Sequence, residues 1–243
     1  MKRSSSYHRP SQDSSRLWLW GSHACQAALK NPNRSCFRLL TTESIAKNLT
    51  FTCKVEILDS AALTRLLPEG AVHQGIAMEV APLPEPSFKE LSQKEKGVLV
   101  VLDHVTDPHN VGAILRTARA LGALGVLMTE RNAPPLSGVL AKTASGALED
   151  LPVWKVTNLA RAIEDLKDKG FWAVGLDERA SKVLSKSDFP PKISLIMGAE
   201  GEGLRRLTQE KCDFLAKLPT DPFFPTLNVS VATALALYEL VRT

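Results

Sequence analysis

The chain has 243 residues, 44% of them hydrophobic, which is enough to build a sizeable core in a small domain joined to a larger one. Its 30 Lys and Arg residues against 26 Asp and Glu residues give a net charge of +4, which suits a polyanionic partner without requiring one. The four cysteines form no Cys-x-x-Cys pair, which argues against a zinc site or a disulfide framework, and no apolar run approaches the roughly 20 residues of a membrane span.

Residues 1–16 are basic and rich in serine, and they predict a disordered tail. The segment has no apolar stretch of the kind found in secretory signals, so it is not expected to be one. The cysteine pattern, without a disulfide framework, favours a reducing cytoplasm. A mitochondrial transit peptide is the less favoured alternative, because the segment is short and contains Asp13.

Residues 17–81 predict a small α/β domain. Ala24, Ala27 and Ala28 follow a helical spacing, and three apolar segments have the length of strands, with a helix at 61–67 between the last two. Those segments are 36–41, 55–60 and 73–80. Residues 82–96 contain three prolines and many charges, which is typical of a linker.

Residues 97–243 alternate between apolar strands and amphipathic helices. Strands are expected at 97–103, 125–130, 171–177, 193–198 and 214–219, and helices at 110–122, 158–170, 204–212 and from Asn228 onward. This alternation predicts a mainly parallel α/β sheet, whose ligands gather where strands end and helices begin.

The stretch MGAEGEGLRR, residues 197–206, lies at such a junction. It fits neither a P-loop nor a dinucleotide-binding motif, which disfavours a dehydrogenase. Glu200 and Glu202 would repel a phosphate, whereas a cationic cofactor has no such conflict. An equally acceptable interpretation is that both stabilise the N-terminus of a helix that begins near Leu204.

The stretch DHVTDPHNVGAILRTAR, residues 103–119, forms a second junction. We expect Asn110 to cap the helix, and Arg116 to lie opposite its apolar stripe, free to bind a phosphate. Taken alone, Arg116 is better explained as a surface arginine on an ordinary helix. His104 and His109 are weak metal ligands because no third ligand accompanies them, so no metal is expected.

A third junction precedes the last helix, where Asn228 is a predicted N-cap and Ser230 lies in the first turn. Capping alone would explain Asn228. A functional role is favoured because three strand-to-helix junctions of one sheet all carry hydrogen-bonding side chains.

Together these motifs resemble the three ordered motifs of the SpoU (TrmH-type) RNA 2′-O-ribose methyltransferases of the SPOUT superfamily. The motifs are Asp103-x-Val-x-Asp107-Pro-x-Asn110-x-Gly112-x-x-x-Arg116-x-Ala118, Met197-Gly198-Ala-Glu200-Gly-x-Gly203 and Leu227-Asn228-Val-Ser230-Val-Ala232. The stretches KTASGALEDLPVWKVTNLARAI and GAVHQGIAMEV resemble the branch that modifies a guanosine of large-subunit ribosomal RNA. Only the tail and the linker lie outside the resemblance.

The resemblance implies a knotted SPOUT domain at 97–243 with a C-terminal trefoil knot, preceded by a small RNA substrate-binding domain. It also implies a homodimer, ribosomal RNA as substrate, and S-adenosylmethionine as cofactor, whose sulfonium and ammonium groups suit a turn that carries carboxylates. The residues that it assigns to the cofactor are Gly198, Leu218, Thr226, Leu227, Ser145 and Gly146.

The resemblance further assigns catalytic roles to Arg116, Asn110, Glu200 and Asn228. Arginine is a reluctant base, with a reference pKa of about 12.5 or more. We therefore expect Arg116 to clamp a phosphate and to stabilise the developing alkoxide, which leaves the proton acceptor undefined.

Residues 221–226 depart from the family pattern, because Phe223 and Phe224 replace small residues while Thr226 keeps a hydroxyl. The two rings are expected either to stack on a base or to pack at a dimer interface. Two alternative functions remain open: a tRNA ribose methyltransferase of the same family, and an RNA-binding assembly factor without catalysis.

Overall fold

The computed structural model describes residues 16–47, 53–224 and 226–242, so the predicted tail lies outside the described residues except for Arg16. The chain divides into two compact units, one formed by residues 1–84 and 136–149 and the other by residues 85–135 and 150–243. A segment from the middle of the chain therefore belongs with the N-terminal unit.

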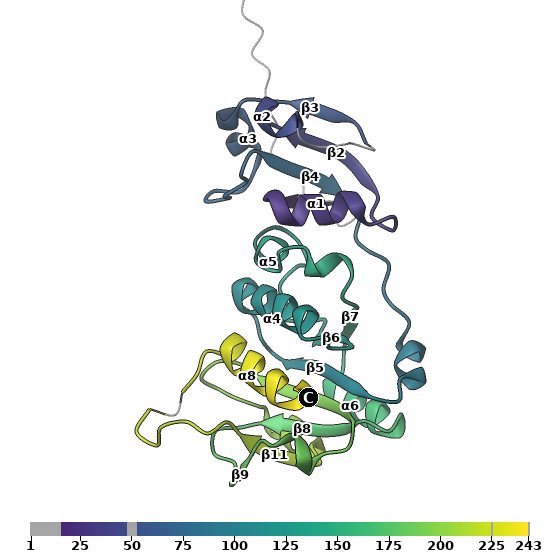
Figure 1. The fold of residues 1–243 in the computed structure, drawn as a ribbon, viewed down its shortest axis with the longest axis vertical. Helices are drawn as coiled ribbons and strands as arrows, with labels where there is room; N and C mark the ends of the chain where they lie inside the picture. The colour runs from purple at the N-terminus through teal and green to yellow at the C-terminus, as the bar shows by residue number, and fades with distance from the viewer. Residues whose placement is uncertain (1–15, 48–52, 225, 243) are drawn as a thin grey trace, which may run out of the picture. The chain divides into compact units, whose positions relative to one another are not determined.

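The first unit is built on a four-stranded sheet in the order β1-β4-β2-β3, in which only β2 and β3 run parallel (Figure 1). Its strands are β1 (Leu17–Trp20), β2 (Cys36–Thr41), β3 (Val55–Ile57) and β4 (Ile76–Val80). Its helices are α1 (Ser22–Lys30), α2 (Glu43–Ala46), α3 (Ser60–Leu66), α5 (Gly138–Thr143) and the 3-10 helix η2 (Ala147–Glu149). Strand β1 was missed by the sequence analysis, because four residues are too few to show a period.

The middle segment packs tightly within this unit. A side chain at Gly138 would come within 2.5 Å of the Trp20 ring, and one at Gly146 would come within 2.8 Å of the Ala27 methyl group. The segment 136–149 can therefore pack this closely against β1 and α1 only because both positions are glycine.

The second unit contains a seven-stranded sheet in the order β7-β6-β5-β10-β8-β11-β9, and all of its strand pairs are parallel. The strands are β5 (Gly97–Asp103), β6 (Gly125–Thr129), β7 (Val153–Val156), β8 (Trp172–Leu176), β9 (Lys182–Val183), β10 (Lys192–Gly198) and β11 (Phe214–Lys217). The predicted parallel α/β sheet is confirmed, although β7 and β9 were not anticipated.

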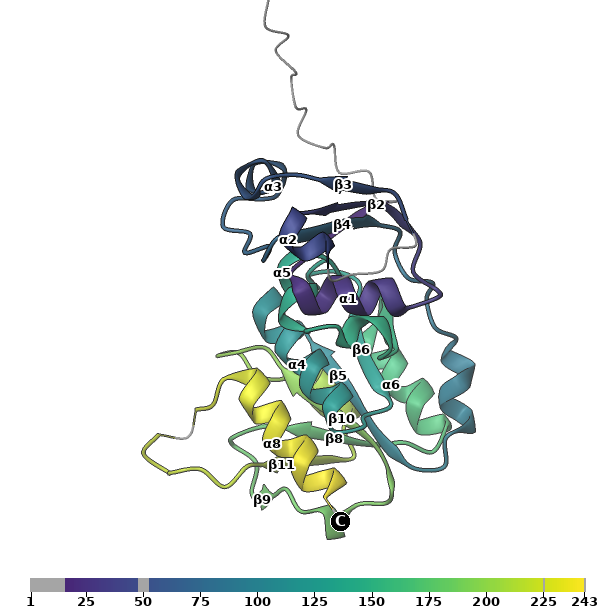
Figure 2. The ribbon, with the colours of Figure 1, turned by 45° about the horizontal axis from the view of Figure 1, so that its top comes forward.

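Helices cover both faces of this sheet (Figure 2). Helices α4 (Pro108–Ala120) and α8 (Val229–Val241) pack side by side and contact the same face, where α8 meets β5 and β10. On the other face, α6 (Leu159–Asp168) and Leu204, which precedes α7 (Arg206–Lys211), pack against alternate residues of the strands. The stretch expected to be a linker carries the 3-10 helix η1 (Phe88–Gln93), whose Leu91 is buried in this core.

Candidate active site

Strand β10 ends at Gly198 and the chain turns back at once, with the Gly203 amide donating to the Ala199 carbonyl at 2.9 Å. A side chain at Gly198 would lie 2.1 Å from the Gly203 carbonyl carbon, so only glycine permits this close approach. Gly201 and Gly203 have φ values of 81° and 70°, a conformation that favours glycine. The three glycines thus shape the turn that presents Glu200 and Glu202.

A chain of hydrogen bonds joins the three predicted motifs. The Asn228 amide donates to Asn110 Oδ1 at 2.9 Å, and the Asn110 amide donates to Glu200 Oε2 at 3.3 Å. Asn228 Oδ1 in turn accepts from the Ser230 amide at 2.9 Å and from the Ser230 hydroxyl at 2.6 Å. Three of the four residues predicted to be catalytic therefore meet at one place.

The two asparagines reach this place by different local structures. Asn228 caps α8, as predicted. Asn110 does not cap α4, which corrects the sequence analysis: Asp107 accepts from the His109 amide at 3.0 Å and Pro108 opens the helix. Proline favours the first helical position, so the cap moves one residue before it. Asn110 lies in the first turn, where its side chain is free to bond across the site.

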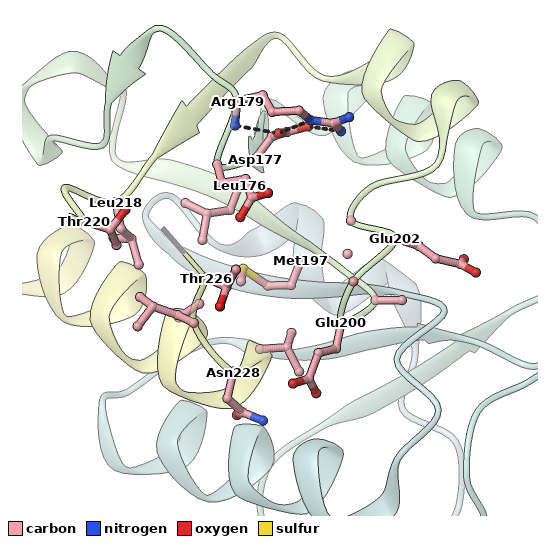
Figure 3. Close-up of a pocket in the computed structure, with 18 residues that line it drawn as sticks. Leu176, Asp177, Arg179, Met197, Glu200, Glu202, Leu218, Thr220, Thr226 and Asn228 are labelled. Carbon is pink, nitrogen blue, oxygen red and sulfur yellow. Dashed lines mark hydrogen bonds and ion pairs between the residues drawn. The ribbon is translucent and has the colours of Figure 1, made fainter. Parts of the chain in front are cut away.

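A cavity of about 450 Å³ opens beside this network, at the carboxyl ends of β8, β10 and β11 (Figure 3). Apolar side chains of Leu176, Met197 and Leu218 form part of its wall, and a rim of charged groups surrounds it. Six predicted site residues line the cavity: Gly198, Glu200, Leu218, Thr226, Leu227 and Asn228.

The remaining predicted residues lie elsewhere. Arg116 is an exposed residue of α4, on the helix side opposite the buried Val111 and Leu115, and it does not line the cavity. Ser145 and Gly146 follow α5 in the first unit and do not line the cavity either. Their assignment to the cofactor stays a prediction, and the contact with Ala27 already explains the glycine.

One pair in the wall was missed by the sequence analysis. Asp177 follows β8 and accepts from the Arg179 backbone amide at 2.9 Å and from Arg179 Nε at 3.0 Å and Nη2 at 2.9 Å. The hydrogen bonds from Arg179 hold the pKa of the Asp177 carboxyl below its usual value despite partial burial. A carboxylate at a strand end, two residues before an arginine, was the signal that could have revealed it.

Asp103 forms an ion pair with Arg205. Its carboxylate is fully buried at the end of β5 and accepts from the Arg205 amide at 3.1 Å and from Arg205 Nε at 2.6 Å. This ion pair fixes the segment that leads from the glycine turn into α7. Helix α7 begins at Arg206 and has no acidic residue in its first turn, so Glu200 and Glu202 both precede the turn where a carboxylate stabilises a helix terminus most.

Phe223 and Phe224 are 98% and 75% exposed within the described residues, which leaves both predicted roles open. Among those residues no three His, Cys, Asp or Glu side chains are grouped so that they could hold a metal ion. No helix in the described part of the chain is long and apolar enough to cross a membrane.

The fold and the site define a class: an α/β protein with a ligand cavity at the carboxyl edge of a parallel sheet, where three polar strand-end motifs converge. Within that class, the chain belongs to the SpoU rRNA Methylase family, whose model matches residues 97–238. Residues 18–86 match a second model, described as RNA 2′-O ribose methyltransferase substrate binding. The identification of the family from its motifs is thereby confirmed.

Relatives of known sequence match nearly the whole chain. The chain is 39% identical over 241 residues to the 23S rRNA (guanosine-2′-O-)-methyltransferase RlmB of Pseudomonas aeruginosa, and the match covers 92% of this chain and 95% of that protein. It is also 39% identical to an uncharacterized tRNA/rRNA methyltransferase of Synechocystis, and there it spans 62% of the relative's length.

Solved structures share the fold. The SpoU methyltransferase AviRb of Streptomyces viridochromogenes, in complex with AdoMet, has a TM-score of 0.80 at 20% identity and covers 96% of this chain and 94% of its own. An AdoMet-bound rRNA methyltransferase of Sinorhizobium meliloti has a TM-score of 0.78 at 21% identity, covering 95% and 88%. The predicted combination of a small α/β domain with a SpoU-type α/β domain is therefore confirmed, whereas the trefoil knot stays a prediction.

Proposed function

We propose that the protein uses S-adenosylmethionine to methylate a ribose 2′-hydroxyl of a guanosine in 23S ribosomal RNA. The observation that carries this proposal is the hydrogen-bonded chain Glu200–Asn110–Asn228 at the edge of the cavity. The names of the relatives favour ribosomal RNA over tRNA. The substrate-binding model matched by residues 18–86 supports the predicted RNA-binding domain at 17–81.

The cavity fits the cofactor chemically. Its lining includes Asp177, Glu178, Glu200 and Glu202 against a single cation, Arg179, and this charge suits a sulfonium and an ammonium group. The leucines Leu176, Leu218 and Leu227 offer apolar surface for an adenine ring. S-adenosylmethionine would supply an electrophilic methyl group there.

The residues around the cavity would orient the ribose. Asn110 and Asn228 hold each other in place, so either amide can fix the direction of the attacking 2′-hydroxyl without first losing side-chain freedom. Arg116 stands on the same helix as Asn110 and is exposed, which suits a clamp on an RNA phosphate beside the developing alkoxide.

A homodimer is part of the proposal. Val231, Leu235 and Tyr238 are exposed at a spacing that places them along one side of α8, and Phe223 and Leu227, which precede the helix in the sequence, are exposed as well. An exposed apolar stripe of this kind is typical of a protein interface. We also propose a cytoplasmic location, where ribosomal RNA is available.

The decisive experiment measures transfer of a radiolabelled methyl group from S-adenosylmethionine to 23S ribosomal RNA and, separately, to tRNA. Ribosomal RNA alone should be labelled, and the label should map to a guanosine ribose. Cofactor binding without transfer to either RNA would indicate an assembly factor. Absence of any calorimetric heat with S-adenosylmethionine, with and without RNA, would refute the enzymatic proposal.

The role of Arg116 has its own test. Arg116→Ala should lower turnover roughly 10²–10³-fold, the cost of losing one electrostatic contact to the transition state, and should leave cofactor affinity unchanged. Arg119→Ala is the matched control, because Arg119 lies one turn further along α4 and pairs with Asp150 on the surface. Full turnover in Arg116→Ala would rule out both the clamp and a general base at this position.

A further inference from the structure

A second cavity, of about 590 Å³, lies at the carboxyl ends of β5, β6 and β7 in the same sheet. We call it the basic groove. It is lined by His104, Thr129, Arg131, Asn132, residues 157–160 and residues 205–208. The groove adjoins the cofactor cavity, because Asp103, just before His104, is the neighbour of Gly198 in the pairing of β5 with β10.

The two cavities have opposite charge. The basic groove is lined by Arg131, Arg205 and Arg206 and by no carboxylate, whereas the cofactor cavity has four carboxylates and one arginine. A groove lined by cations focuses a positive potential and attracts a polyanion. The sheet edge therefore offers one site suited to a cationic cofactor and a neighbouring site suited to phosphates.

The arginines of the groove are available to a ligand. Arg205 is fixed through Nε by the buried Asp103, and among the described residues its η nitrogens have no hydrogen-bond partner. Arg206 is 85% exposed and lies 3.7 Å from Glu210, too far for a hydrogen bond. Within the described residues the Arg131 side chain makes no ion pair or hydrogen bond.

The backbone of the groove is held in an unusual conformation. Four non-glycine residues of the described chain have a left-handed φ, and two of them, His104 at 59° and Asn132 at 66°, line this groove. Just before Asn132, the Thr129 hydroxyl donates to the Arg131 carbonyl at 2.9 Å, which fixes the start of the loop after β6. Such strain is retained where the surrounding structure fixes it and is enriched at ligand sites.

The N-terminus of α6 adds to the same field. The helix begins at Leu159, with Asn158 as its cap, and both residues line the groove. A helix N-terminus carries partial positive charge and favours an anion. In the described part of the chain, three carboxylates contact residues of the groove without lining it: Asp103 at Arg205, Glu210 at Arg206, and Glu130, which accepts from the Thr157 hydroxyl at 3.2 Å.

We propose that the basic groove binds the phosphodiester backbone of the RNA substrate and carries the strand past the cofactor cavity. This inference rests on the proposed function, which makes RNA the substrate. Arg131, Arg205 and Arg206 contact phosphates, and the exposed Leu207 offers apolar surface to a ribose or a base.

The experiment measures binding of an in vitro transcript of 23S ribosomal RNA by the full chain, at several salt concentrations, together with methyl transfer. The variants are Arg131→Gln and Arg206→Gln. The matched control is Lys94→Gln, which removes one exposed positive charge from the end of η1, outside both the cofactor cavity and the basic groove. Arg205 is spared, because its loss would leave the buried Asp103 without its partner.

Each groove variant should raise the RNA dissociation constant about 3- to 10-fold and lower the slope of log affinity against log salt by about 1, the signature of one lost phosphate contact. Affinity for S-adenosylmethionine should stay at the wild-type value. The proposal is overturned if both variants keep the wild-type affinity and slope, or if Lys94→Gln loses as much. Failure of the unaltered protein to bind or methylate RNA would instead count against the proposed function itself.

Discussion

At the scale of single residues, Asn110 links two elements that are far apart in the sequence. Its oxygen accepts from Asn228 and its amide donates to Glu200, so α8 and the glycine turn are both tied to α4 through one side chain. Since these two hydrogen bonds fix the orientation of the Asn110 side-chain amide, the donor and the acceptor that it presents to a ligand are fixed as well.

Replacing Asn110 by alanine should therefore disorder the site without emptying the cavity. We expect kcat for RNA methylation to fall about 100-fold, as for loss of one preorganised hydrogen-bonding group, with cofactor affinity within about twofold of wild type. Methyl-transfer kinetics and calorimetry measure the two quantities. Asn33→Ala, at an exposed turn of the first unit, should change neither, and an unchanged kcat in Asn110→Ala would contradict the proposed role.

At the scale of elements, the glycine turn after β10 shows why a short segment can form a wall of the cavity. Gly198 lets the backbone of Gly203 approach at a distance that a side chain would forbid, and Gly201 adopts a left-handed conformation in open space. The two glycines are therefore needed for different reasons, and they can be separated by substitution.

Gly198→Ala should force the turn open, because the new methyl group would meet backbone rather than a flexible side chain. We expect a loss of about 1–3 kcal/mol in the free energy of unfolding, as for overpacking, and more than tenfold weaker binding of S-adenosylmethionine. Denaturant titration and calorimetry provide both numbers.

Gly201→Ala is the matched variant, since nothing lies within 4 Å of its added methyl group. It should cost about 1–2 kcal/mol from the left-handed backbone alone and should leave cofactor affinity close to wild type. Equal effects of the two substitutions on binding would show that close packing of the turn is not what shapes the cavity.

At the scale of the molecule, the middle segment 136–149 is tied into the first unit by a buried ion pair. Arg34 donates to Glu149 through Nε at 3.0 Å and Nη2 at 2.8 Å, and through Nη1 to the Ala81 carbonyl at 2.7 Å. The two side chains are only 1% and 5% exposed. Asn31 adds a bond to the Glu149 backbone carbonyl at 2.9 Å.

Breaking this pair from one side should destabilise the first unit strongly. Arg34→Met leaves the Glu149 carboxylate buried without a counter-charge, and we expect a loss of about 3–5 kcal/mol in the free energy of unfolding. The double variant Arg34→Met, Glu149→Leu should recover a large part of it, because no charge then stays buried. Denaturant unfolding of the three proteins tests this, and a double variant no more stable than Arg34→Met would contradict it.

The sequence by itself determined five of the seven strands of the parallel sheet, the cap at Asn228 and the polar residues at the strand ends, because apolar runs and caps depend on neighbours a few residues away. It misplaced the cap of α4, since Asp107 and Asn110 are both good caps and the choice fell to the proline between them.

Only the tertiary structure decided that β10 lies between β5 and β8, which brings Glu200 to Asn110, and that Glu149 pairs with Arg34. It also decided that Arg131, after β6, and Arg205 and Arg206, at the start of α7, line the same groove. These contacts span 90 residues or more in the first two cases, and no local pattern records which distant segments meet. That outcome depends on how the buried faces of all strands and helices pack together.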